Sequence, residues 1–103
     1  SKGLASSNGM MLAFSATTGE TVAILRDEGW LTDMRTAIGG ALATRALACT
    51  SASKVLLIGT GIQAKMQAKC LVKLMPERGL TFRVWGRNST AAHNTAAELS
   101  KQG

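Results

Sequence analysis

Hydrophobic and polar positions divide the first half of the chain into two short apolar runs and one long segment rich in small residues. The runs at residues 10–15 and 21–25 are separated by Ala-Thr-Thr-Gly-Glu, which predicts a β-hairpin with Gly19 at positive φ. A turn at residues 27–29 then leads to a helix over residues 32–48, capped by its first residue, Thr32. Its interior glycines each cost about 1 kcal/mol relative to alanine. We therefore expect this helix to approach a neighbouring element closely and to bury a wide face.

The second half of the chain alternates strand and helix patterns. Residues 54–58 predict a strand: after Lys54 the run is fully apolar, typical of a parallel sheet that is covered on both faces. A glycine-rich turn, a helix over residues 62–75 and a strand over residues 81–85 follow. Ser89 or Thr90 can cap a last helix rich in alanine. The fold class is therefore α/β, and we expect apolar faces that nothing in this chain covers.

Length and cysteine content exclude several classes of protein. The chain has 103 residues, and no apolar run approaches the length of about 20 residues that spans a membrane. Its two cysteines, Cys49 and Cys70, form no CxxC pair, so we expect neither a disulfide framework nor a metal site. Without a secretory signal in the first residues, the expected compartment is the cytoplasm, with no membrane partner.

The basic residues are unevenly distributed. Residues 1–53 carry four Lys or Arg and four Asp or Glu, whereas residues 54–103 carry eight and two, so the net charge of +6 lies in the second half. Such a surplus suits a polyanion, either a nucleic acid or a phosphorylated cofactor. Phe82 and Trp85 share one apolar run instead of forming a stacking platform. We therefore expect no nucleic-acid partner; steep salt dependence of oligonucleotide binding would indicate the contrary.

One motif carries chemistry. Residues 59–64 have the pattern G-x-G-x-x-A between the predicted strand and helix, which is typical of a dinucleotide-binding turn. Gly59 permits the tight turn, Gly61 lets the backbone approach a pyrophosphate, and Ala64 keeps the helix close to the strand. The N–H groups and dipole of the helix then face the phosphates. The alternative is a glycine-rich turn without a ligand.

The end of the second strand bears on the choice of cofactor. An acidic residue there would bind the ribose 2′-OH and repel a 2′-phosphate. This chain instead has Gly86, Arg87 and Asn88. Because the guanidinium group of Arg87 suits a 2′-phosphate, we favour NADP(H) over NAD(H). The alternative is that Arg87 is a solvated loop residue.

Arg35 has two interpretations. We place it in the first turn of its predicted helix, where the helix dipole disfavours a cation. It could form a structural salt bridge with Asp33 or Glu28. It could equally hold, together with Thr36, the phosphate or carboxylate of a ligand. The spacing of these residues does not decide between the two.

A combination of motifs resembles the ornithine cyclodeaminase/mu-crystallin family. The element L-T-x-x-R-T-A and the element G-x-G-x-Q-A are together quite specific for it. Order and gaps match along nearly all of the chain, in residues 8–12, 18–19, 31–37, 59–64 and 84–87.

The resemblance implies a two-domain, usually dimeric, NAD(P)-dependent protein. Residues 1–52 would be part of a substrate and dimerisation domain, a hairpin plus a linking helix. Residues 53–103 would be the first half of a Rossmann domain. The leading implied function is that of an ornithine cyclodeaminase, a lyase that cyclises and deaminates an amino acid. The alternatives are a ketimine or Δ1-pyrroline-2-carboxylate reductase and a mu-crystallin-like NADP-dependent binding protein.

The resemblance also assigns roles to individual residues. Arg35 would contact the carboxylate of an amino-acid or cyclic-imine substrate, or the nicotinamide end of the cofactor. One small polar contact falls on Ser6 or Ser7. The implied cofactor-binding residues are Ser7, Arg35, Thr36, Gly59, Gly61, Ile62, Gln63, Ala64, Gly86, Arg87 and Asn88.

The chain also departs from the family pattern. The family's substrate-binding Lys and an additional Arg match positions before residue 1, and its catalytic Asp matches a position after residue 103. Asp27 and Asp33, in a predicted turn and helix cap, cannot replace that Asp. We therefore expect no catalytic residue in this chain, which would be an inactive segment of a longer enzyme.

Overall fold

The computed structural model describes residues 3–4 and 7–101 as two compact units, residues 1–34 and residues 35–103. The division falls within one helix, α1 (Trp30–Leu47). Across the described residues, no helix combines the length and apolar character needed to cross a membrane.

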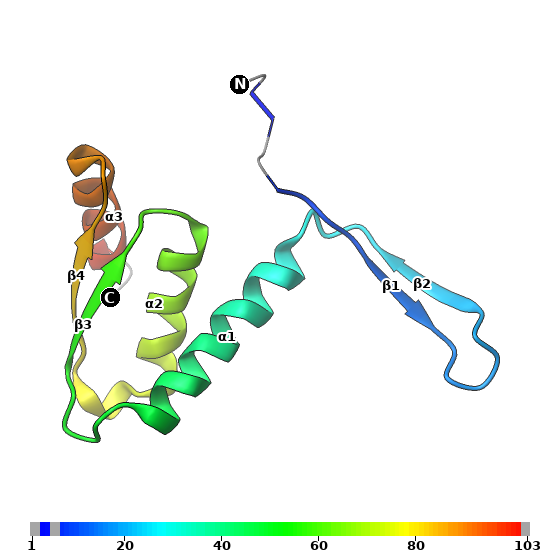
Figure 1. Ribbon diagram of the computed structural model, residues 1–103, viewed down its shortest axis with the longest axis horizontal. Coiled ribbons are helices and arrows are strands. Elements are labelled where there is room, and N and C mark those ends of the chain that lie inside the picture. Colours follow the sequence, from blue (N-terminus) through cyan, green and yellow to red (C-terminus); the bar gives the residue numbers. More distant parts are fainter. Residues whose placement is uncertain (1–2, 5–6, 102–103) are drawn as a thin grey trace. The chain divides into compact units, whose positions relative to one another are not determined.

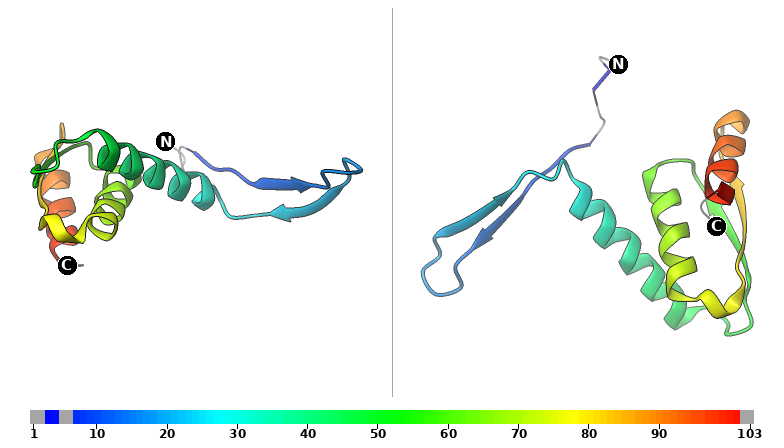
Figure 2. Two further views of the ribbon diagram at one scale, coloured as in Figure 1. Left: turned by 90° about the horizontal axis from the view of Figure 1, so that it is seen from below. Right: turned by 180° about the vertical axis from the view of Figure 1, so that it is seen from behind.

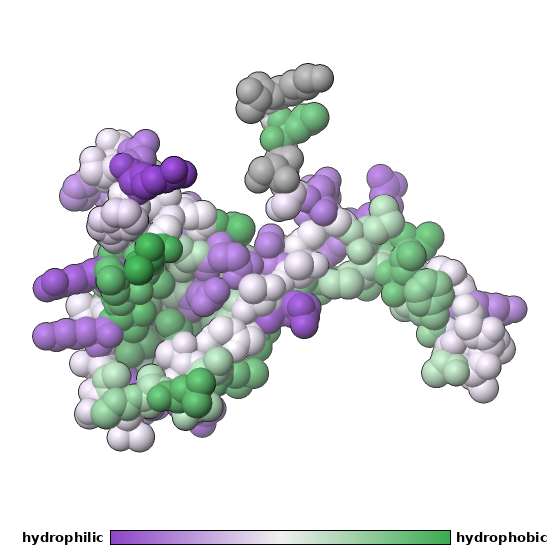
Figure 3. All heavy atoms as spheres, viewed as in Figure 1, coloured by the Kyte–Doolittle hydropathy of each residue, from purple (hydrophilic) through white to green (hydrophobic). Residues whose placement is uncertain are grey.

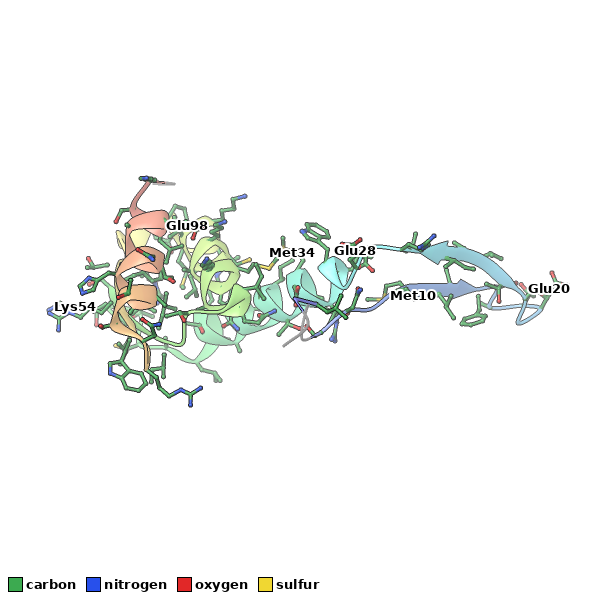
Figure 4. All side chains as sticks on the ribbon, turned by 90° about the horizontal axis from the view of Figure 1, so that it is seen from above. Met10, Glu20, Glu28, Met34, Lys54 and Glu98 are labelled. Carbon is green, nitrogen blue, oxygen red and sulfur yellow. The ribbon has the colours of Figure 1, made fainter. Side chains whose placement is uncertain are left out.

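The first unit contains the predicted hairpin. Strands β1 (Met11–Phe14) and β2 (Thr21–Leu25) pair antiparallel (Figure 1). Gly19 has a φ of 76°, as predicted, and Glu20 lies near the tip of the hairpin (Figure 4). Large apolar side chains are exposed along both strands, as the green surface of the hairpin in Figure 3 shows; they include Leu12, Phe14, Val22 and Ile24.

The start of α1 differs from the prediction. The helix begins at Trp30, so Thr32 lies inside it and is not its cap. Asp27 supplies the cap: its carboxylate accepts hydrogen bonds from the N–H of Leu31 at 2.6 Å and of Gly29 at 3.3 Å. The chain can turn into the helix here because Glu28 and Gly29 both have positive φ. As a result, Arg35 lies in the second turn of α1, past the first-turn N–H groups.

The second unit contains a parallel β–α–β arrangement. Strand β3 (Lys54–Ile58) and strand β4 (Thr81–Trp85) lie side by side in parallel, joined by helix α2 (Ile62–Leu74) and the short helix η1 (Pro76–Arg78) (Figure 1, Figure 2). Helix α3 (Ser89–Lys101) follows and packs on β4 and α2. The predicted order of strands and helices is confirmed in this unit.

The core of this unit lies on one face of the sheet. Leu71 and Met75 of the α2 region pack with Ala41 of α1, and Val55 and Phe82 of the two strands contact this cluster. The other face is open: the side chains of Leu56, Ile58 and Trp85 are 60%, 73% and 57% exposed. This uncovered apolar face agrees with the expectation from the sequence.

The contact between α1 and α2 is narrower than expected. Only Ala37 and Ala41 are buried on α1, whereas Ile38 and Leu42 are about half exposed. The expectation of a widely buried face was therefore wrong, because small residues on several sides of a helix do not identify which side packs. Close approach does occur at Gly40, where a Cβ would lie 2.6 Å from Oε1 of Gln67.

Candidate functional site

The turn between β3 and α2 has the features that the G-x-G pattern predicts. Gly59 has a φ of 126°, a conformation that L side chains rarely adopt. Gly61 precedes the first helical residue with an extended backbone, φ −82° and ψ −176°, and gives α2 no side-chain cap. A Cβ on Gly61 would meet no atom within 4 Å. The N-terminus of α2 thus borders open space on the Gly61 side.

Replacing Gly59 by alanine is expected to destabilise the fold. The Cβ would meet no atom within 4 Å, so the cost comes from the backbone at φ 126°. Strain of this kind costs about 1–3 kcal/mol. Urea unfolding of the full-length protein measures it. Gly39→Ala is the matched control, because that glycine is helical and has equally open surroundings. Equal stability of Gly59→Ala and wild type would contradict the argument.

The loop after β4 lies beside this turn. The N–H of Gly59 donates a hydrogen bond to the carbonyl oxygen of Trp85 at 2.7 Å. Gly86, the next residue, lies so close to Thr60 that a Cβ on residue 86 would be 2.8 Å from Cγ2 of Thr60. The turn with Gly61 and the loop with Arg87 therefore form one edge of the sheet, at the carboxyl ends of both parallel strands.

Asn88 forms hydrogen bonds at the start of α3, which were not predicted from the sequence. Its Oδ1 accepts a hydrogen bond from the N–H of Ala91 at 3.1 Å, and its carbonyl oxygen accepts one from Ala92. Asn88 therefore caps α3, and the expected cap at Ser89 or Thr90 was wrong. The side-chain oxygen of Asn88 is used for this cap. A contact of Asn88 with a cofactor stays a prediction.

Asn88→Ala is expected to lower the free energy of unfolding by about 1 kcal/mol, the usual cost of losing an N-cap. Asn88→Asp keeps an acceptor at the same place and should stay close to wild type. The melting temperature of the full-length protein distinguishes the two variants. If Asp and Ala destabilise the protein equally, the hydrogen bond to Ala91 does not account for the effect.

The remaining predicted site residues lie in several places. Ile62 and Arg87 are exposed, while Gln63 and Ala64 are half-buried in the first turn of α2. Ser7 is exposed in the first unit, and Ser6 lies outside the described residues. Thr60 was not predicted from the sequence, because its place in the site depends on the strand register that pairs Ile58 with Trp85, which no local sequence pattern indicates.

Arg35 and Thr36 are exposed on α1. Gly40 lies against Gln67, and Ala41 packs with Leu71, so residue numbers rise in the same direction along α1 and α2. Thr36 lies about one turn before Gly40, as Gln63 lies one turn before Gln67. Thr36 is therefore on the part of α1 toward the N-terminus of α2, the end that carries the glycine turn.

An ion pair joins α2 to α3. Nζ of Lys65 lies 2.8 Å from Oε2 of Glu98, which Figure 4 labels on α3. The hydrogen bond and the charge of Lys65 lower the pKa of Glu98 below its ordinary value. Because the folded-state pKa is the lower one, the pair stabilises the fold above the unfolded pKa of the carboxyl group. The contribution is lost as the pH falls through the folded-state pKa.

Lys65→Met is expected to move the pKa of Glu98 up toward its ordinary value. A carboxyl-resonance NMR titration measures this, with Lys73→Met as a control because Lys73 is an exposed lysine on the same helix. A pKa of Glu98 that stays unchanged in Lys65→Met would show that Lys65 is not its cause.

Comparison with known proteins identifies the family. The model of the ornithine cyclodeaminase/mu-crystallin family matches residues 1–103. The chain belongs to this family. The resemblance inferred from the two sequence elements is therefore confirmed.

Relatives of the chain carry different enzyme names. A Sinorhizobium fredii protein named as an uncharacterized cyclodeaminase is 40% identical over 97 residues, which are 94% of this chain and 29% of that protein. The Δ1-pyrroline-2-carboxylate/Δ1-piperideine-2-carboxylate reductase of Azospirillum brasilense is 38% identical over 88% of this chain and 29% of that protein. The chain thus spans less than a third of the length of these relatives.

A solved structure extends the comparison to the fold. The Δ1-pyrroline-2-carboxylate reductase of Thermococcus litoralis, in complex with NADH and L-proline, is 29% identical to this chain and superposes with a TM-score of 0.76. The match covers 90% of this chain and 28% of that one. The hairpin, long helix and parallel β–α–β arrangement are therefore shared with that reductase.

Proposed function

We propose that this chain provides the dinucleotide-binding turn of an NAD(P)H-dependent reductase acting on a five- or six-membered cyclic imine carboxylate. The observation that carries the proposal is the space at the N-terminus of α2, where Gly61 has no neighbour within 4 Å of a Cβ position. The substrate class comes from relatives named as Δ1-pyrroline-2-carboxylate reductases and from the solved neighbour that holds NADH and L-proline.

The residues present fit such a cofactor. The N–H groups in the first turn of α2 would donate hydrogen bonds to the pyrophosphate, assisted by the positive end of the helix dipole. Gly61 leaves the phosphates room, and Ile62 and Gln63 would lie against them. Gly86 and Asn88 would border the adenosine ribose. When bound, the dinucleotide supplies the hydride that reduces a C=N bond, and the protein orients it.

Arg35 and Thr36 would extend the site from α1. Arg35 is an exposed cation whose planar guanidinium group suits a carboxylate with two oxygens. Thr36 lies on the part of α1 that is toward the N-terminus of α2, where the glycine turn is. This placement supports a contact of Thr36 with a cofactor phosphate. Ser7 would supply a further polar contact.

Arg87 supports NADPH as the preferred cofactor. It is exposed at the end of β4, where an acidic residue would repel a 2′-phosphate. The solved neighbour holds NADH, so the preference proposed here rests on Arg87 alone and not on the family.

The hairpin supports the proposal that the first unit belongs to a substrate and dimerisation domain. Its exposed apolar side chains, such as Phe14 and Ile24, are suited to burial by further protein. The boundary proposed after residue 52 and the homodimer of the whole protein stay predictions.

Ornithine cyclodeamination is the second candidate function. One observation favours it, the name of the Sinorhizobium fredii relative as a cyclodeaminase. Both reactions use the same cofactor-binding turn, so the geometry of this chain does not separate them. The reductase stands first because several relatives and the solved neighbour carry that name.

The test uses the full-length protein that contains this chain. With NADPH and Δ1-pyrroline-2-carboxylate, we expect oxidation of NADPH, followed at 340 nm, and equimolar formation of L-proline. With L-ornithine and NAD⁺, we expect no ammonia above background. Release of ammonia from ornithine without net consumption of cofactor would make the protein a cyclodeaminase. Tight NADPH binding without either turnover would indicate a binding protein.

A further inference from the structure

The side chain of Thr60 lies against the backbone of Gly86. A Cβ on residue 86 would be 2.8 Å from Cγ2 of Thr60 and 3.8 Å from its Oγ1. The methyl group of Thr60, and not its hydroxyl, therefore occupies the space beside Gly86. Both residues are half-buried.

The strand register explains why these two residues meet. Ile58 pairs with Trp85, and the N–H of Gly59 donates to the carbonyl oxygen of Trp85 at 2.7 Å. Thr60 is the next residue of the turn and Gly86 the next residue of the loop. Because threonine is branched at Cβ, its χ1 has few favourable values and its methyl group is a stiff spacer.

We propose that the Thr60–Gly86 contact sets the separation between the pyrophosphate-binding turn and the ribose-binding loop, which makes Thr60 a positioning residue for the adenosine half of the dinucleotide. The inference rests on the function proposed above. Gly61 lies on one side of this contact and Arg87 on the other. A ligand that contacts both the turn with Gly61 and the loop with Arg87 must match the separation between them. A ligand held by the loop alone need not match it.

The proposal is tested by two substitutions, one that adds a methyl group at Gly86 and one that removes a methyl group from Thr60. Gly86 is not among the positive-φ glycines, so alanine is compatible with its backbone. Gly86→Ala adds a methyl group that collides with Cγ2 of Thr60 and forces the two loops apart. Thr60→Ser removes Cγ2 and keeps the hydroxyl. In the double variant, the methyl group added at residue 86 fills the space that Cγ2 of Thr60 has vacated.

The dissociation constant for NADPH is measured on the full-length protein. Gly86→Ala is expected to weaken NADPH binding about tenfold, as overpacking at a close contact does. In the Gly86→Ala background, Thr60→Ser is expected to restore NADPH affinity to within about threefold of wild type. Such a rescue is expected because the effects of substitutions at two residues in contact are not additive. Adenosine 2′-monophosphate reaches the Arg87 loop but has no pyrophosphate. Because it need not match the separation between turn and loop, Gly86→Ala should weaken its binding less than that of NADPH.

Controls separate positioning from general damage. Gly39→Ala is the matched glycine replacement, in open surroundings within α1, and should bind NADPH as wild type does. Melting temperatures identify any variant that is simply unfolded.

Three results would overturn the proposal. One is an unchanged NADPH affinity in Gly86→Ala; another is a loss that Thr60→Ser does not repair. The third is an equal loss for NADPH and adenosine 2′-monophosphate. If wild type itself binds no nicotinamide dinucleotide, the proposed function fails and this inference fails with it.

Discussion

Enlarging the side chain at residue 61 is expected to remove cofactor binding while leaving the fold intact. In the full-length protein, Gly61→Val should weaken NADPH binding about 100-fold, because two charge-assisted hydrogen bonds from the α2 N-terminus to the pyrophosphate would be lost. Gly61→Ala should fall between valine and wild type. The fold should tolerate both, since φ is −82° and no atom lies within 4 Å of the Cβ position.

Isothermal titration calorimetry with NADPH measures the series, and Gly39→Ala serves as the control for adding a methyl group at a glycine. The side chain at residue 61 would occupy the space that we assign to the phosphates, so affinity should fall steadily with its size. Wild-type affinity in Gly61→Val, with an unchanged melting temperature, would place the pyrophosphate elsewhere.

Removing the charge at residue 87 is expected to change the choice of cofactor. Arg87→Ala should weaken NADPH binding about 30-fold, the loss of a charge-assisted pair with the 2′-phosphate. NADH lacks that phosphate, so its affinity should stay within about twofold. The ratio of the two dissociation constants, measured on one preparation, reports the effect.

Arg83→Ala is the matched control, since Arg83 is an exposed cation on β4, the strand before the Arg87 loop, in register with Leu56. It removes the same net charge without touching the loop after β4. An equal loss of NADPH affinity in Arg87→Ala and Arg83→Ala would mean that Arg87 acts through the general positive charge of residues 54–103. Equal losses for NADPH and NADH in Arg87→Ala would remove the basis for preferring NADPH.

Local patterns predicted the turn between β3 and α2 well. The apolar run at residues 55–58, the glycines at 59 and 61 and the strand at 81–85 are each recognisable within a short window. They also agree with one another, because a parallel β–α–β unit needs all of them in this order. The same holds for the hairpin, where Gly19 supplies the positive φ of the turn.

Helix starts were predicted less well, since several neighbouring residues can cap a helix. Asn88, Ser89 and Thr90 are all competent caps, and only the path of the backbone assigns the cap to Asn88. At α1, Asp27 caps from three residues ahead of Trp30 because Glu28 and Gly29 adopt positive φ. A positive φ at glutamate is uncommon, and no local sequence pattern predicts it.

Contacts between distant segments could not be predicted at all. The small residues of α1 are compatible with several packed faces, and the contact of Gly40 with Gln67 selects one of them. The contact of Thr60 with Gly86 likewise depends on the register of β3 against β4. Family resemblance proposed site residues on the chain but gave no geometry for them.

The most direct test of the central claim is a crystal structure of the full-length protein with NADPH. The account predicts the pyrophosphate within hydrogen-bond distance of the N–H groups that begin α2, beside Gly61. It also predicts the 2′-phosphate at Arg87. A pyrophosphate bound away from Gly61, with the first turn of α2 facing only solvent, would contradict it.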